Sequence, residues 1–74
     1  MMTFDSIKEY AKTIDKNVLI SFDVGYGKSV TYTILCVRGN TYDTAKVTSL
    51  DEDTVKPLVK SLIQKVEQLY DGNS

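Results

Sequence analysis

Residues 18–38 read VLISFDVGYGKSVTYTILCVR, two alternating stretches on either side of a short segment that contains two glycines. Before that segment, every second side chain is apolar: Val18, Ile20, Phe22 and Val24. After it, the same alternation gives one side of the chain to Val30, Tyr32, Ile34 and Cys36. Alternation of this kind is typical of strands with one buried face. The sequence therefore predicts a hairpin of two strands, over residues 18–24 and 29–38.

The triplet Gly-Lys-Ser at residues 27–29 is the end of the phosphate-binding P-loop motif, and it lies in this hairpin's turn. A P-loop also needs a glycine five residues before the Gly of that triplet, and a helix directly after it. Phe22 occupies the glycine position, and residues 30–34 alternate like a strand. The segment therefore predicts a turn of the chain and no nucleotide site.

The length of this turn sets which residues of the two strands face each other. A three-residue loop over residues 25–27 would pair Phe22 with Val30 and keep the apolar side chains of both strands on one face. A five-residue loop that reaches Ser29 has the same parity, so the sequence leaves both lengths open.

Gly39-Asn40 is the signal of a two-residue hairpin, and a third strand follows over residues 41–48. This turn would pair Ile34 with Ala45 on the inner face of the sheet. The third strand has a weak apolar pattern and many threonines, which is typical of an edge strand.

The beginning of the chain predicts a helix over residues 3–16, with Thr3 as its N-cap and Asn17 as a left-handed stop. Its apolar side chains recur at helical spacing: Phe4, Ile7, Ala11 and Ile14.

The end of the chain predicts a second helix, which finishes at Gly72. Its apolar stripe is broad: Val55, Leu58, Val59, Leu62, Ile63, Val66, Leu69 and Tyr70. Pro57 in a helix interior costs about 3 kcal/mol, more than the capping box that begins at Ser49 contributes. We therefore expect the helix to begin at Asp53, after a separate turn over residues 49–52.

The predicted order is α-β-β-β-α in a single domain over residues 1–74. The fold class is α+β, with a three-stranded antiparallel meander and both helices packed on one face, because this arrangement buries every apolar stripe. A core of this size supplies only about 3–5 kcal/mol of net stability.

This order and length resemble the double-stranded RNA-binding domain over nearly the whole chain, as topology. That family carries a lysine-rich motif at the start of its second helix, where residues 49–53 here read SLDED. Its first hairpin loop usually carries Gly-Pro-x-His, where residues 25–28 here read GYGK. The resemblance makes a nucleic-acid-binding module the alternative function, and both departures argue against it.

Composition argues against catalysis and against a nucleic acid partner. The nine basic and ten acidic residues give a net charge of −1, which provides no positive field for phosphates. The chain has no histidine, and Cys36 is its single cysteine, in an apolar run typical of a core position. We expect no enzyme activity, no cofactor and no metal. We also expect no membrane segment, since no apolar run reaches about 20 residues, and a cytoplasmic location.

Two surfaces are candidates for binding a protein. The first, called the outer patch, lies on the side of the sheet opposite the helices and consists of Leu19, Leu35, Val37 and Tyr42. The second combines the first hairpin's tip with the acidic residues before the last helix: Tyr26, Lys28, Asp51, Glu52 and Asp53. We expect a small non-enzymatic protein-binding domain, such as an accessory or inhibitor protein. Its partner would be an unknown protein or a second copy of itself, in a homodimer.

Overall fold

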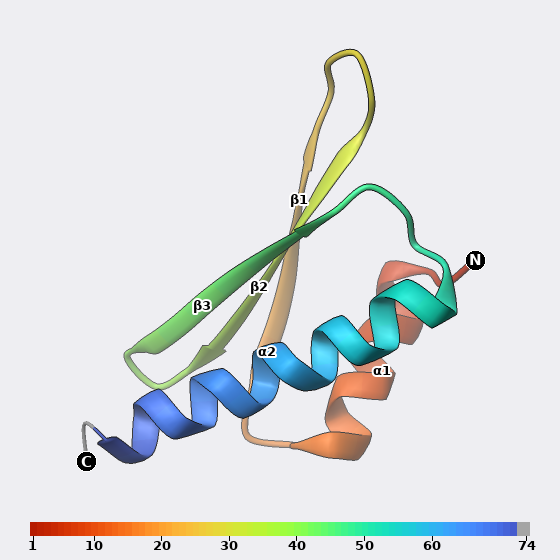
Figure 1. Ribbon diagram of the computed structural model, residues 1–74. Helices are drawn as coiled ribbons and strands as arrows, with labels where there is room; N and C mark the ends of the chain where they lie inside the picture. The colour runs from red at the N-terminus through yellow and green to blue at the C-terminus, as the bar shows by residue number, and fades with distance from the viewer. Residues whose placement is uncertain (73–74) are drawn as a thin grey trace.

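The computed structural model describes residues 1–72, and it has the predicted order of elements (Figure 1). The elements are α1 (Phe4–Ile14), β1 (Leu19–Gly25), β2 (Thr31–Arg38), β3 (Thr41–Val47) and α2 (Glu52–Gly72). The three strands form one antiparallel meander in the order β1-β2-β3. Both helices lie on the same side of this sheet, with α2 running across it (Figure 1). The α+β prediction is confirmed. No helix of residues 1–72 is both long enough and apolar enough to cross a membrane.

Thr3 caps α1, as predicted. Its hydroxyl accepts a hydrogen bond from the Ser6 amide at 3.0 Å, and the Ser6 hydroxyl accepts one from the Thr3 amide at 2.9 Å. This reciprocal pair is a capping box, which satisfies two amides that the first turn leaves unpaired.

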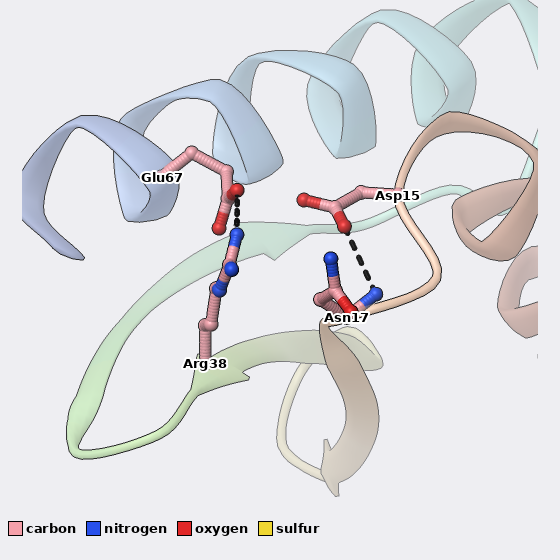
Figure 2. Close-up of polar contacts among 4 residues, drawn as sticks. All are labelled: Asp15, Asn17, Arg38 and Glu67. Carbon is pink, nitrogen blue, oxygen red and sulfur yellow. Dashed lines mark hydrogen bonds and ion pairs between the residues drawn. The ribbon is translucent and has the colours of Figure 1, made fainter. Parts of the chain in front are cut away.

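The predicted left-handed stop at Asn17 is wrong, because no residue other than glycine has a positive φ among residues 1–72. The Asn17 amide instead donates a hydrogen bond to the Asp15 carboxylate at 2.9 Å (Figure 2). An aspartate side chain that accepts from the amide two residues later forms an Asx-turn, which ends α1 without a left-handed residue.

The first hairpin keeps the predicted faces but not the predicted register. Phe22 faces Ile34, and the last pair of the ladder is Gly25 with Thr31. The loop is therefore the five-residue segment 26–30. The predicted alternative of five residues has the right length but ended at Ser29, one residue too early, and the three-residue loop is wrong. Relative to the three-residue loop, each residue of β1 faces a partner four positions further along, an even shift that leaves every side chain on its predicted side.

Two aromatic residues of this hairpin pack against α1. The Phe4 ring from the first turn of α1 stacks on Phe22, with centroids 4.3 Å apart and planes 9° from parallel. The same ring meets the edge of Tyr32 at 6.0 Å. Phe22 and Tyr32 are diagonal neighbours on the inner face of the sheet, so one helix residue contacts both.

The second hairpin has the predicted register, with Ile34 facing Ala45. Gly39 takes a φ of +60°, and Asn40 does not have a positive φ. A positive φ at the first loop residue alone is characteristic of a type II′ turn, whose twist matches that of the flanking strands.

The core lies between the helices and the inner face of the sheet. Its buried apolar residues are Met2, Ile7, Ala11, Val18, Ile34, Cys36, Val47, Leu50, Val55, Val59, Leu62, Ile63 and Val66. Met2 and Leu50 lie outside the periodic segments, and no sequence pattern assigned them to the core. The Met2 amide donates to the Leu50 carbonyl at 2.8 Å, which joins the chain before α1 to the connection after β3.

The second helix begins at Glu52, one residue before the predicted start. The Asp51 carbonyl accepts the first helical hydrogen bond, from the Val55 amide at 2.9 Å. The Ser49 hydroxyl accepts from the Asp51 amide at 3.2 Å, in a turn of its own before the helix. Pro57 lies in the second helical turn and withholds the amide that would reach the Asp53 carbonyl. Asp53 is exposed, so water can satisfy that carbonyl and the proline is tolerated.

Candidate functional site

The four residues of the outer patch alternate with the buried residues of the strands, so they lie together on the face of the sheet that the helices leave open. Figure 1 shows both helices on the other face. Leu19 faces Val37 across β1 and β2, and Val37 faces Tyr42 across β2 and β3. The three side chains therefore form one row across all three strands. Leu35 stands two residues along β2 from Val37, on the same face. The patch is continuous.

The two ends of this row are the most exposed parts of the patch. Leu19 is 72% exposed and Tyr42 is 66% exposed, while Leu35 and Val37 on the central strand are half-buried between their neighbours. Large apolar side chains that remain in water on a small domain are typical of a surface that another molecule covers. The patch has the shape of a shallow apolar band with two accessible ends.

The observed register is what brings Leu19 into the patch. With a three-residue loop in the first hairpin, Leu19 would face Thr33 and would lie apart from Val37. The five-residue loop places Leu19 directly beside Val37. The sequence predicted that these four residues share one face, and the observed register brings Leu19 closer to Val37 than the predicted three-residue loop did.

The other end of the open face is polar. Asp23 faces Thr33, and Thr33 faces Lys46, so that a carboxylate and an ammonium stand on opposite edges of the sheet. Asp23 and Lys46 are both exposed. Between this row and the apolar row lies a mixed one, Ser21–Leu35–Thr44. The face thus changes from apolar to charged along the strand direction.

The second candidate surface is divided between two distant parts of the fold. The loop over residues 26–30 projects beyond the end of β3, while the connection after β3 turns away from it toward the start of α2 (Figure 1). We expected Tyr26 and Lys28 to lie near the acidic residues 51–53. The structure does not bring these two groups together. β3 ends where Val47 faces Tyr32, and the chain then turns back so that Leu50 enters the core.

Each half of that surface has its own surroundings. Tyr26 is 83% exposed at the loop. Glu52 forms an ion pair with Lys56 one turn along α2, and the hydrogen bond from Lys56 lowers the pKa of the Glu52 carboxyl. This is an exposed helix pair of the kind that contributes a few tenths of a kcal/mol.

A group of polar contacts that the sequence did not reveal joins α2 to the second hairpin. Arg38 at the end of β2 reaches up to Glu67 on α2 and pairs with its carboxylate (Figure 2). The Arg38 guanidinium also lies over the Tyr70 ring, 4.3 Å from its centroid. Arg38 and Glu67 are 29 residues apart along the chain, so no local sequence pattern predicts their contact.

A second ion pair supports the same junction. The Lys65 ammonium lies 3.1 Å from the Asp43 carboxylate, which joins α2 to β3. The Thr44 amide, and after it Lys65, lower the pKa of Asp43 through hydrogen bonds to its carboxylate. The whole group fixes the second half of α2 against the sheet, which is a structural role.

Cys36 is buried in the core beneath this junction. Burial, and after it the nearby carboxylate charges of Asp15, Glu67 and Asp43, raise the pKa of its thiol to about 11. A thiol with so high a pKa holds its proton at neutral pH and is a poor nucleophile. Residues 1–72 contain no cluster of three or more histidine, cysteine or acidic side chains placed to hold a metal ion.

Comparison of the chain with protein-family models, with curated proteins and with solved structures finds no match. A function must therefore be inferred from the surface of the chain itself. The outer patch is its continuous row of apolar side chains on the open face of the sheet.

Proposed function

We propose that this chain is a small non-enzymatic protein-binding domain, of the accessory or inhibitor kind, that acts through the open face of its sheet. One observation carries the proposal: a continuous apolar row, Leu19–Val37–Tyr42, crosses all three strands and has no helix over it. A cytoplasmic location accords with the lone buried thiol of Cys36.

The patch has the composition of an interface centre. Covering an exposed leucine side chain contributes roughly 1.5–3 kcal/mol. Tyrosine is enriched among the few residues that dominate binding energy, since its ring supplies a large contact area at low cost in conformational entropy. The hydroxyls of Ser21, Thr33 and Thr44 lie on the same face and would supply the polar rim that such interfaces have.

Substitution of the patch tests the proposal. Leu35→Lys with Val37→Lys places two charges in the centre of the face and is expected to weaken binding to a partner protein at least roughly tenfold. Leu19→Ser with Tyr42→Ser removes the two most exposed side chains and should act in the same direction with less risk to folding. Tyr26→Ser is the matched control, because it removes an exposed tyrosine from outside the patch.

The measurement is capture of partners from the native host by each variant, quantified by mass spectrometry, beside the oligomeric state of the pure protein. Circular dichroism establishes that each variant is folded. Unchanged capture and unchanged oligomeric state in both folded patch variants would falsify the proposal.

A nucleic-acid-binding module is the second candidate, and the α-β-β-β-α order supports it. The net charge of −1 and the exposed acidic residues 51–53 at the start of α2 oppose it. A gel shift with duplex RNA and duplex DNA over a range of salt concentrations separates the two functions. We expect no shift at physiological salt, and a clear shift would favour this candidate over protein binding.

A further inference from the structure

We infer that the open face binds a second copy of the same chain, face to face, about a twofold axis that runs along β2. This inference rests on the proposed function, since it takes the open face as an interface and names what covers it. The observation that carries it is the placement of one negative and one positive charge at opposite edges of that face.

Asp23 on β1 and Lys46 on β3 stand in the same row, with Thr33 of β2 between them. Two strand spacings separate them, about 10 Å, and side chains stand roughly perpendicular to a sheet. None of the ion pairs formed within residues 1–72 includes either of them. Each is an exposed charge on a face that is otherwise neutral.

The axis lies between the two faces, parallel to β2. Rotation about it places β1 of one copy opposite β3 of the other, and each row of residues across the strands faces the same row of the second copy. Asp23 of each copy then meets Lys46 of the other, so that two ion pairs form. In the apolar row, Leu19 meets Tyr42, and Val37 meets Val37. Leu35 meets its own counterpart at the centre. Both the charges and the apolar side chains are matched.

The other twofold axes do not achieve this. An axis across the strands over the middle row would place the apolar row opposite the charged row, so that Leu19 would meet Asp23 and Tyr42 would meet Lys46. The same axis over the apolar row would place that row opposite itself and would leave Asp23 and Lys46 unpaired. An axis perpendicular to the sheet would join edges and leave the outer patch in water. Only the axis along β2 covers apolar side chains with apolar ones and pairs opposite charges, as a self-complementary interface requires.

The size of the face sets the strength to expect. Three strands of seven or eight residues make a face about 14 Å wide and about 23 Å long. Its area is less than the roughly 800 Å² per partner of a standard interface. We therefore expect a weak dimer, with two sheets about 10 Å apart and strands crossing at about 30°. The association should be measured up to high protein concentration.

Charge reversal with complementation is the test. Asp23→Lys places like charges opposite each other twice, and so does Lys46→Asp, so each variant alone should self-associate at least roughly tenfold more weakly than the wild type. An equal mixture of the two variants restores both pairs, and so does the double variant Asp23→Lys/Lys46→Asp. Matched controls carry the same charge changes on the exposed helix surface, Asp5→Lys and Lys60→Asp.

Sedimentation equilibrium of each protein and of the mixture gives the dissociation constants, with circular dichroism to establish folding. Dimerisation of the wild type, its loss in each single variant and its return in the mixture support the inference. A monomeric wild type overturns it, and so does a dimer that the mixture fails to restore. If the wild type is monomeric but the patch variants still lose a host partner, the proposed function stands and a different protein covers the face.

Discussion

Gly39 begins the turn between β2 and β3 with a φ of +60°, and its missing side chain makes room for Tyr70. A Cβ atom at this position would lie 3.2 Å from the Tyr70 ring. The same ring carries the Arg38 guanidinium on its face. One glycine thus serves two purposes, because it permits the turn and it lets the end of α2 approach the hairpin.

Gly39→Ala should therefore lower the free energy of unfolding by about 1–2 kcal/mol, from the left-handed backbone and the crowded ring. Urea denaturation followed by circular dichroism measures the change. Gly27→Ala is the control, since a Cβ there meets no atom within 4 Å and the φ is not positive, and it should be close to neutral. Equal effects of the two substitutions would contradict the account of Gly39.

Cys36 makes stability depend on pH in the alkaline range. The ordinary pKa of 9.0 in the unfolded chain rises to about 11 in the fold, so the folded state holds its proton more tightly. The stability that the protonated Cys36 thiol contributes is therefore fully present below pH 9 and is lost as the pH rises through about 11. Over that window the free energy of unfolding should fall by about 2 kcal/mol more in the wild type than in Cys36→Ala.

Urea denaturation of both proteins at pH 8, 9, 10 and 11 gives this difference. Lysines and tyrosines titrate in the same range in both proteins, so the comparison isolates the thiol. Parallel pH profiles for the wild type and Cys36→Ala would show that the thiol does not contribute.

At the scale of elements, α2 is fixed at its second half by side chains rather than by the apolar stripe alone. Arg38 pairs with Glu67, and both side chains are about three-quarters covered, at 25% and 28% exposed. Lys65 pairs with Asp43 on β3. These contacts connect the helix to the β2–β3 hairpin and determine how the last turns lie over the sheet.

Arg38→Ala should cost about 1–2 kcal/mol, because it removes a partly covered ion pair and a cation–π contact together. Hydrogen exchange should also become faster in the last turns of α2 than in its first turns. Lys56→Ala is the matched control, because it also removes an ion pair and a cation–π contact, here with the Tyr10 ring 5.1 Å away. Its side chain and that of Glu52 are 40% and 61% exposed, so it should cost less than about 0.5 kcal/mol. If Arg38→Ala lowers stability as little as the control does, Arg38 does not anchor the end of α2.

The elements themselves were largely predictable from the sequence, because the periods of 3.6 and 2 residues extend over whole helices and strands. The boundaries and the first register were not. The first hairpin pairs Phe22 with Ile34, but every loop of odd length keeps the apolar side chains of both strands on one face, so the alternation cannot choose among these registers. Similarly, the left-handed stop at Asn17 was predicted from the preference of asparagine for that conformation. The chain instead ends α1 with a hydrogen bond from the Asn17 amide to the Asp15 carboxylate.

At the scale of the whole molecule, the sheet has one covered face and one open face, and this asymmetry makes the outer patch a surface. The sequence identified Leu19, Leu35, Val37 and Tyr42 from strand alternation and from the turn at Gly39, whose register was correct. It could not place the first hairpin's tip relative to α2, since that depends on where the connection after β3 travels. It also gave no sign that Asp23 and Lys46 share a row, because that needs both registers at once.

The same two charges bear on a hazard that comes from the strand edges. β1 and β3 are both edge strands, and each carries unpaired backbone groups that could template addition of another chain. Asp23 on β1 and Lys46 on β3 put a charge on each edge strand, which is one way that natural sheets discourage edge-to-edge pairing. Reversing these charges preserves that protection, whereas neutral apolar replacements would remove it. The charges proposed to orient a second copy would thus also discourage the addition of a third.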